Sequence, residues 1–263
     1  MARLHLFEWE DQPWLPRVLR DYVTDHLQYA QTGRHLEPAH TAIAEHLAGA
    51  LRQLGERRIV DLCSGASGPL LAVRPRLATL LGGPVEVTLT DLYPNLDAFR
   101  GVSGDGVGFA AEPVDATAVP TRLAGLRTMF TALHHFPPAR ARAVLADAVA
   151  SGAGIAIFEP LERTLRVVAL TTVNGLVRGF LLTPILPNRS LARLLATYVV
   201  PVGPFILTWD GIVSALRTYS VDELRELSRG LGEGRYEWEI DRMPMATPVG
   251  PVYWTYLIGL PKA

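Results

Sequence analysis

Lysine is almost missing from this sequence. Of its 25 lysine and arginine residues, only Lys262, next to the last residue, is a lysine. Enzymes that form a Schiff base with a substrate or with pyridoxal phosphate need a buried lysine. A P-loop needs a lysine directly after its glycines. The sequence therefore excludes both of these enzyme classes.

Cysteine and metal-binding motifs are also scarce. Cys63 is the single cysteine, which excludes an internal disulfide and fits a reducing compartment, so we expect a cytoplasmic protein. The seven histidines include the adjacent pair His134 and His135, but no His-Glu-x-x-His motif and no cysteine cluster occurs. Catalytic metal ions are held by ligand sets of these kinds. We therefore predict no metal site.

The sequence has neither a strong excess of one charge nor a clear membrane segment. Its formal net charge of −1 at pH 7 argues against a general nucleic-acid-binding surface. The first residues carry charges and prolines where a signal peptide needs a continuous apolar run. The most apolar stretch, residues 167–186, contains Asn174 and Arg178, which argue against a transmembrane helix. We expect no nucleic-acid partner and no membrane span.

Apolar strands alternate with helical segments through the middle of the chain. With 49% hydrophobic residues, the chain can bury a sizeable core. Pro38 and Gly55 suit the first turn and the C-cap of a helix, and apolar residues recur between them at helical spacing. Strands alternating with helices predict βαβ units and a mostly parallel sheet. We expect five buried strands within residues 58–64, 85–92, 106–116, 127–134 and 153–160.

The remaining segments complete the predicted fold. Residues 68–81 predict a helix interrupted near Pro75, and residues 137–151 a helix that opens at proline. Ser220 and Glu223 form a capping-box pattern that starts a helix ending at Gly230. Two alternating stretches, residues 236–244 and 252–261, predict antiparallel strands. The sequence thus predicts an α/β, Rossmann-like fold whose sheet has seven strands, mostly parallel, with an antiparallel last strand.

Four parts follow from these patterns. Residues 1–36 are rich in aromatics and predict short helices that form a lid. Residues 37–162 predict the cofactor-binding core. Residues 163–218 are apolar and broken by prolines, which indicates a helical insertion after the fifth strand. Residues 219–263 predict the end of the core with its antiparallel strand pair.

The glycine-rich turn after the first strand is the strongest signal of a site. It reads Asp61-Leu62-Cys63-Ser64-Gly65-Ala66-Ser67-Gly68. In an open α/β sheet, ligands bind beyond the carboxyl ends of the strands. A dinucleotide fingerprint would read Gly-x-Gly-x-x-Gly, but Cys63 replaces its first glycine. Asp61, directly before the turn, would repel a pyrophosphate and suits an ammonium group.

That turn resembles motif I of the class I S-adenosylmethionine (SAM)-dependent methyltransferases, and the resemblance continues in order to about residue 160. It implies that Asp61 orients the amino-acid end of the donor and that Asp91 binds both ribose hydroxyls. It also implies that Asp115 and Ala116 contact the adenine, and that the stretch "TMFTALHHF" borders the methyl donor. Cys63 departs from the family, which usually has glycine there. The cofactor-binding residues implied are Asp61, Ser64, Gly65, Asp91, Leu92, Asp115, Ala116, Thr131 and Ala132.

Three residues are candidates for the chemistry. His134 and His135 follow the fourth strand, where a histidine could deprotonate a phenol or a carboxylic acid. The alternative is that one histidine packs against the cofactor and the other faces outward. Glu159 ends the fifth strand, where it could hold an amine acceptor or fix the loop through backbone hydrogen bonds. Asp210 could contribute from the insertion, although a helix cap explains it better.

The resemblance and the apolar insertion together predict the acceptor. We expect a methyltransferase that acts on a small apolar or aromatic molecule by direct in-line transfer. The sequence "HFPP" lacks the leading residue of the [DN]-P-P-[YFW] motif typical of nucleobase methyltransferases. The insertion could form the acceptor pocket or a homodimer interface. Two alternatives stay open: a membrane-associated lipid or quinone methyltransferase, and a SAM-binding protein that does not methylate.

Overall fold

The chain divides into two compact units. The computed structural model describes residues 1–263 except 34–35, 66–67, 187–188, 246–249 and 263. One unit, the sheet unit, contains residues 34–160 and 220–263, and the other, the helical unit, contains residues 1–33 and 161–219. The residues predicted as a lid and as an insertion thus belong to one helical unit.

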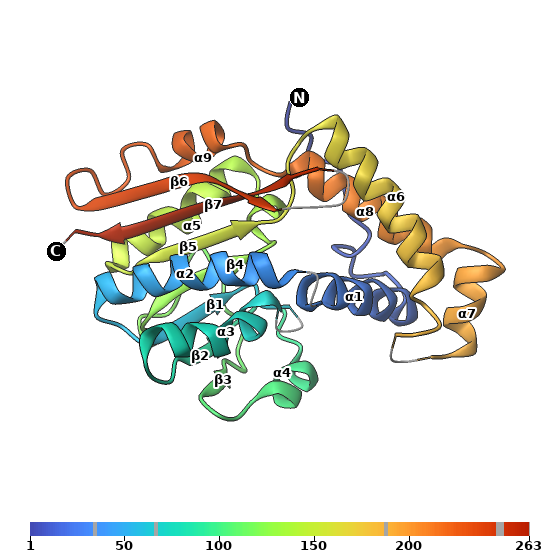
Figure 1. The fold of residues 1–263 in the computed structure, drawn as a ribbon, viewed down its shortest axis with the longest axis horizontal. Coiled ribbons are helices and arrows are strands. Elements are labelled where there is room, and N and C mark those ends of the chain that lie inside the picture. The colour runs from blue at the N-terminus through green and yellow to red at the C-terminus, as the bar shows by residue number, and fades with distance from the viewer. Residues whose placement is uncertain (34–35, 66–67, 187–188, 246–249, 263) are drawn as a thin grey trace. The chain divides into compact units, whose positions relative to one another are not determined.

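The sheet unit is built on a seven-stranded sheet with the order β3-β2-β1-β4-β5-β7-β6 (Figure 1). The first five strands pair in parallel, and β7 pairs antiparallel with both β5 and β6. The predicted fold class is therefore confirmed. The strands are β1 (Arg58–Leu62), β2 (Glu86–Leu89), β3 (Val107–Phe109), β4 (Leu126–Phe130), β5 (Ile155–Glu159), β6 (Tyr236–Met245) and β7 (Val252–Pro261).

Helices bury their apolar faces against the sheet, and an α-helix lies between β1 and β2, between β2 and β3, and between β4 and β5. Ile43, Leu47 and Leu51 of α2 are fully buried, and this helix ends where Gly55 adopts a left-handed φ of 62°. That conformation costs glycine little because it has no Cβ. The helices of this unit are α2 (Glu37–Leu54), α3 (Gly68–Leu81), α4 (Leu96–Val102), α5 (Pro138–Ser151) and α9 (Val221–Ser228), with a 3₁₀ turn η2 (Leu133–His135).

The structure tests three predictions about where helices begin, end or are interrupted. The interruption predicted near Pro75 is wrong, because α3 continues through that proline. The Ser220–Glu223 capping box is confirmed, with both reciprocal hydrogen bonds formed. The helix that it starts ends at Ser228, before Gly230. The short helix α4 was not predicted.

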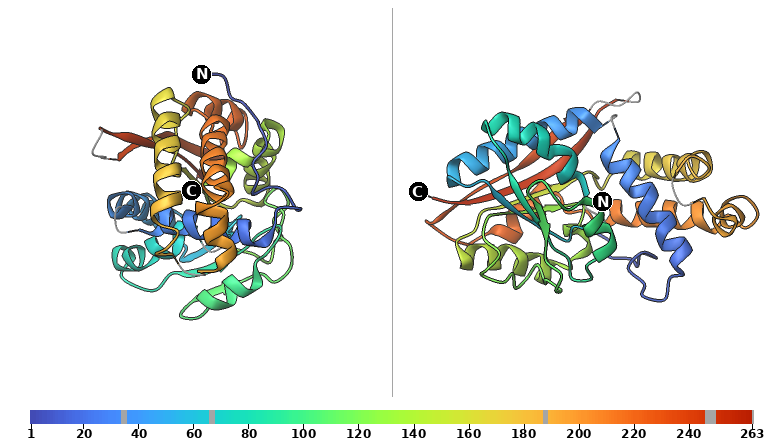
Figure 2. Two further views of the ribbon diagram at one scale, coloured as in Figure 1. Left: turned by 90° about the vertical axis from the view of Figure 1, so that its right-hand side faces the viewer. Right: turned by 90° about the horizontal axis from the view of Figure 1, so that it is seen from below.

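The helical unit contains α1 (Arg17–Thr32), α6 (Leu165–Leu181), α7 (Leu191–Tyr198) and α8 (Val202–Arg217). Helices α6 and α8 lie side by side (Figure 2). Their close approach depends on small residues: a Cβ placed on Gly175 would lie 2.7 Å from Thr208 Oγ1, and one on Gly179 would lie 2.9 Å from Pro204 Cβ. Gly175 and Gly179 form a Gly-x-x-x-Gly pattern, which lets two helix backbones come close together.

Buried charges fix the N-terminal segment to α8. The Arg217 guanidinium pairs with Glu8 at 3.2 Å and with Asp11 at 2.9 Å. The Asp210 carboxylate accepts hydrogen bonds from the backbone N–H groups of Trp9 and Glu10. Asp210 lies in the middle of α8, so its expected role as a helix cap is wrong. Within the described part of residues 1–36, a helix of 16 residues, α1, replaces the short helices expected.

Within the described residues, no single helix has the length and apolar character needed to cross a bilayer. Only α7 and α8 taken together meet that criterion, and the chain bends by 70° between them.

The helix packing predicts opposite effects for two glycine-to-alanine changes. Gly175→Ala should lower the free energy of unfolding by about 1 kcal/mol, because the steric cost of overpacking exceeds the gain in helix propensity. Gly49→Ala, in α2, should raise it by about 0.5–1 kcal/mol, since nothing lies within 4 Å of the added Cβ. Denaturant unfolding curves of the two variants measure both changes. Equal effects of the two substitutions would contradict the close packing at Gly175.

Candidate cofactor and active site

The candidate residues gather at one edge of the sheet unit. Because β1, β2, β4 and β5 are parallel neighbours, their carboxyl ends meet at the same edge (Figure 1). From β1, the chain proceeds to β2 on one side and later to β4 on the other, which makes this edge a topological switch point. Asp61 lies on β1, Asp91 follows β2, Thr131 follows β4, and Glu159 ends β5.

Asp61 ties the ends of three strands together. Its side chain is 2% exposed. The carboxylate accepts a hydrogen bond from Thr128 Oγ1 of β4 at 2.6 Å and from Ser64 Oγ at 2.8 Å. The carbonyl oxygen of Asp61 accepts from both the N–H and the hydroxyl of Thr90, which follows β2. The carboxylate is therefore held in one orientation by neighbouring hydroxyl groups.

The environment of Asp61 makes its negative charge costly. Burial raises the pKa of this carboxyl to about 7, although the hydrogen bonds from Thr128 and Ser64 act to lower it. The nearby charge of Asp91 acts in the same direction as burial. A cationic group that bound beside Asp61 would reverse this effect, because an opposite charge favours the ionised carboxylate. The site is thus suited to an ammonium ligand.

The carboxylate of Asp91 is the second one held in place at this edge, and the backbone of Gly65 contributes to this. Gly65 has a φ of 53°, and its N–H donates to Asp91 Oδ2 at 2.9 Å. The other oxygen of Asp91 accepts the backbone N–H of Tyr93 at 2.9 Å. Leu92, between Asp91 and Tyr93, is 38% exposed. The glycine turn after β1 therefore orients the acid that follows β2.

Two residues at this edge adopt a backbone conformation that favours glycine. Cys63 has a φ of 56°, so it takes the conformation that a glycine at this position would take. Burial raises the pKa of its thiol. Thr131 has a φ of 54°, which is a true outlier for a β-branched residue. Its hydroxyl is buried without a hydrogen-bond partner among the described residues, and strained positions of this kind cluster at functional sites.

Asp115 lies between β3 and β4 and is already engaged by protein groups. Its carboxylate accepts from the N–H and hydroxyl of Thr117 and pairs with Arg140 at 2.9 Å. Although desolvation acts to raise it, the pKa of Asp115 is lowered by the hydrogen bonds from Thr117 and by Arg140. Ala116, next to it, is buried. Contact of Asp115 and Ala116 with an adenine stays a prediction.

His134 and Glu159 form a buried dyad. Glu159 Oε2 lies 2.7 Å from His134 Nδ1, and the two side chains are 4% and 1% exposed. Glu159 Oε1 accepts the backbone N–H groups of Leu133 and His134. The predicted fixing of the loop by Glu159 is thus present in the structure. A carboxylate that accepts Nδ1–H fixes the tautomer and orientation of a histidine, which is the arrangement that prepares the ring for proton transfer.

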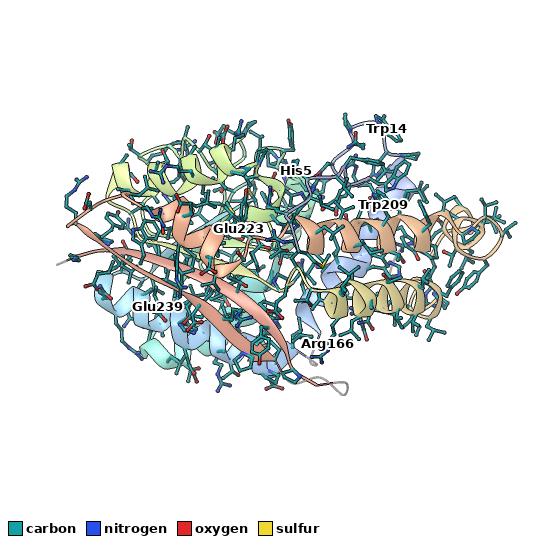
Figure 3. All side chains as sticks on the ribbon, turned by 90° about the horizontal axis from the view of Figure 1, so that it is seen from above. His5, Trp14, Arg166, Trp209, Glu223 and Glu239 are labelled. Atoms are coloured by element: carbon teal, nitrogen blue, oxygen red, sulfur yellow. The ribbon has the colours of Figure 1, made fainter. Side chains whose placement is uncertain are left out.

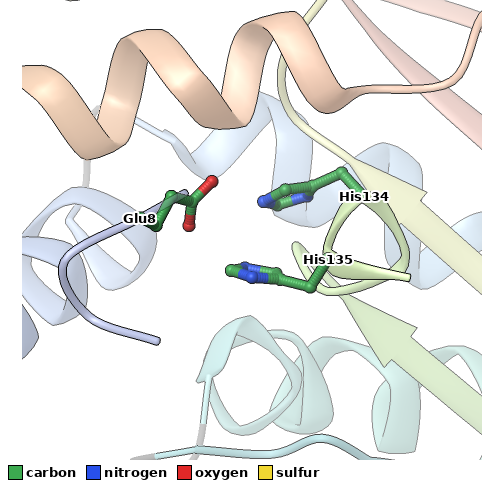
Figure 4. A group of neighbouring side chains, drawn as sticks. All are labelled: Glu8, His134 and His135. Carbon is green, nitrogen blue, oxygen red and sulfur yellow. The ribbon is translucent and has the colours of Figure 1, made fainter. Parts of the chain in front are cut away.

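His135 lies beside His134 and is less buried. Figure 4 shows the two rings next to each other, with centroids 4.3 Å apart. The N–H of His135 donates to the carbonyl of Ala132, which closes the turn after β4. Ala132 itself is buried. The buried carboxylate of Glu159 thus holds the ring of His134, and a role in proton transfer stays a prediction for both histidines.

Sequence reasoning missed two residues that shape this site. Thr128 orients Asp61 from the neighbouring strand, and Arg140 holds Asp115 from the first turn of α5. Thr128 carried a usable signal, because it is a hydroxyl residue next to Arg127 within a strand that is buried along its whole length. Arg140 carried none, since its partner lies far away in the sequence and only the fold brings them together.

Comparisons with known proteins support the fold. No protein-family model and no curated protein sequence matches the chain. The plantazolicin methyltransferase BpumL, solved with SAH, is similar with a TM-score of 0.54 at 11% identity, over 97% of this chain and 93% of BpumL. The magnesium protoporphyrin IX methyltransferase ChlM from Synechocystis PCC 6803, solved with bound SAH, gives 0.44 at 14% identity, over 88% and 86%.

A third similar structure is the O-methyltransferase NcsB1 from neocarzinostatin biosynthesis, solved with SAM and a naphthoic acid. Its TM-score is 0.45 at 16% identity, and the match covers 92% of this chain but only 60% of NcsB1. At these identities the similarity concerns the fold alone. The match to BpumL, with its TM-score of 0.54, is the one that supports the shared fold. The chain has the Rossmann-like fold found in SAM-dependent methyltransferases.

The buried carboxyl of Asp61 predicts a pH-dependent loss of stability. Because its pKa is raised in the folded state, the folded protein holds a proton that the unfolded chain releases between about pH 4 and 7. The free energy of unfolding should fall as pH rises through this range. Asp61→Asn removes the effect, so its advantage over the wild type should grow by on the order of 3 kcal/mol between pH 5 and 8.

Denaturant unfolding at a series of pH values measures that difference. Asp97→Asn, a change at an exposed acid of α4, should follow the wild-type pH profile. Parallel profiles for Asp61→Asn and the wild type would show that the folded pKa of Asp61 is not raised.

Proposed function

We propose that this protein is a SAM-dependent methyltransferase that acts on a small apolar or aromatic molecule. The observation that carries the proposal is the pair of fixed carboxylates at the switch point. Asp61 is buried with a raised pKa and suits the ammonium of an amino acid, while Asp91 is held by Gly65 and suits a pair of ribose hydroxyls. A ligand with both groups is a nucleoside that carries a free amino acid, such as SAM.

The residues present fit that donor. Asp61 would hold the amino group, Asp91 the ribose, and Asp115 with Ala116 the adenine. Ser64 supports the fit indirectly, because its hydroxyl holds Asp61. When bound, the donor supplies a methyl group on a sulfonium centre, which an acceptor attacks in line. Exclusion of water and positioning of the acceptor provide most of the acceleration in such a transfer.

The His134–Glu159 dyad favours an acceptor that must lose a proton. With Nδ1–H held by Glu159, Nε2 is the basic nitrogen of the neutral ring. His134 would take the proton of a phenol as the acceptor oxygen gains the methyl group, and Glu159 would stabilise the imidazolium that forms. A carboxylic acid is already ionised near neutral pH and would need no base. Glu159 then acts as a positioning residue. The proposal is therefore transfer to oxygen, with His134 as general base.

Donor binding tests the first part of the proposal. Isothermal titration calorimetry should detect binding of both SAM and its demethylated product, SAH. Asp91→Ala should weaken both affinities by about 10- to 100-fold, because it removes a charge-assisted hydrogen-bond acceptor. Asp97→Ala, a change at an exposed acid, should leave them unchanged. No binding of either compound to the wild type would overturn the donor site, and an unchanged affinity in Asp91→Ala would overturn the ribose assignment.

Turnover tests the second part. With a panel of phenols as acceptors, His134→Gln should lower kcat by about 10²- to 10⁴-fold and leave SAM affinity unchanged. Glu159→Gln should also lower kcat and shift its pH profile, whereas His135→Gln should have a smaller effect. A loss of activity in His135→Gln but not in His134→Gln would reverse the assignment. Donor binding without turnover of any acceptor would favour a SAM-binding protein that does not methylate.

A further inference from the structure

The helical unit exposes an extensive apolar surface. Thirteen large apolar side chains between Leu165 and Phe205 are 37–75% exposed. We call these thirteen side chains the apolar face. At roughly 100 Å² each they cover on the order of 1,000 Å², whereas the largest apolar patch of a typical monomer covers about 300–600 Å². A surface of this extent marks an interaction site.

Three helices contribute to the apolar face, and a groove joins part of it. Leu176 of α6 and Phe205 of α8 belong to it, and both also line a groove of about 280 Å³ together with Phe180 and Trp209. Tyr198 of α7 joins this group, since its hydroxyl donates to the carbonyl of Phe180 at 2.6 Å. Figure 3 labels Trp209 on α8 and Arg166 on the neighbouring helix α6.

The residues of the apolar face on α6 lie away from the close contact with α8. On α6, Val173, Leu176 and Val177 are exposed, and their spacing places them on one side of the helix. The opposite side carries Gly175 and Gly179, which pack against α8. The helices are therefore held together by one side of α6, and the exposed side needs a different partner.

The charges of this segment are all of one sign. Every charged residue between Glu162 and Asp210 is an arginine, namely Arg163, Arg166, Arg178, Arg189 and Arg193. Arg193 is buried and pairs with Asp25 at 2.6 Å, while Arg166 and Arg189 are exposed. A symmetric dimer places the same patch of both copies face to face, so it would bring arginine toward arginine with no acid from this segment between them. The partner that fits is anionic as well as apolar.

We propose that the apolar face docks on the surface of an anionic lipid bilayer. Such a surface offers an apolar interior for the aliphatic side chains and phosphate groups for the arginines. It also makes no demand for a complementary shape. This interaction goes beyond the proposed methyl transfer and does not depend on donor binding, so either can fail while the other holds.

Cosedimentation of the full chain with vesicles tests the proposal. The wild type should bind vesicles of phosphatidylcholine mixed with phosphatidylglycerol, and less strongly at high salt. Val177→Ser/Leu181→Ser should reduce the bound fraction by about tenfold or more, because two exposed aliphatic groups no longer enter the lipid. Leu4→Ser/Leu6→Ser, the same kind of change at exposed residues outside the apolar face, should bind as the wild type does.

A further variant tests the role of the arginines in the same assay. Arg189→Gln should weaken binding to vesicles containing phosphatidylglycerol by about fivefold and leave binding to pure phosphatidylcholine unchanged. Circular dichroism and unfolding curves should show that every variant folds. The proposal is overturned if the wild type does not bind the mixed vesicles, or if both double variants bind equally. Sedimentation velocity gives the other contrary outcome, a dimer that Val177→Ser/Leu181→Ser dissociates.

Discussion

The site depends on the hydrogen bonds that fix the buried carboxylate of Asp61. It lies on the central strand β1 and is fixed by a hydroxyl from β4 and by another from the turn after β1. The same residue's carbonyl oxygen binds Thr90 at the end of β2. The hydrogen bonds from hydroxyl groups do not offset the cost of burying the ionised carboxyl, so burial raises its pKa to about 7. A cationic ligand beside Asp61 would offset the cost of burying the ionised carboxyl. The site therefore reaches its full stability only when such a ligand is bound.

Strained backbone conformations occur at the same edge of the sheet as Asp61. Cys63 and Thr131 both hold left-handed conformations, directly after β1 and directly after β4. Each costs on the order of 1 kcal/mol, and such strain persists where the surrounding structure over-determines it. The turn after β1 brings Gly65 to Asp91, and the turn after β4 brings His134 to Glu159. Strain and a buried charge together build a rigid site before any ligand arrives.

The sequence was sufficient for the sheet, and less so for the site. Apolar runs between helical segments predicted the first five strands, and β1, β4 and β5 are buried almost throughout. Stretches of alternating apolar and polar residues predicted the last two strands. The pairing of Glu159 with His134 follows from the topology, since β4 and β5 are neighbours and both residues lie at their carboxyl ends. Thr128 could have been noticed as a hydroxyl residue within a predicted strand, but its partner Asp61 is assigned only by the pairing of β1 with β4. Arg140 could not be assigned in advance, because only the fold brings it to Asp115. Pro75 misled the prediction, since a helix can continue through a proline when its other contacts hold it.

Proton release on SAM binding reports whether the Asp61 carboxyl ionises when the donor binds beside it. Calorimetry of SAM binding at pH 7, in buffers of different ionisation enthalpy, gives the number of protons released. If Asp61 has a pKa of about 7 and then faces an ammonium group, the wild type should release about half a proton on binding. Asp61→Asn should release none and bind more weakly. Binding of SAM by the wild type without proton release, or equal release by Asp61→Asn, would show that Asp61 does not pair with the ammonium group of the donor.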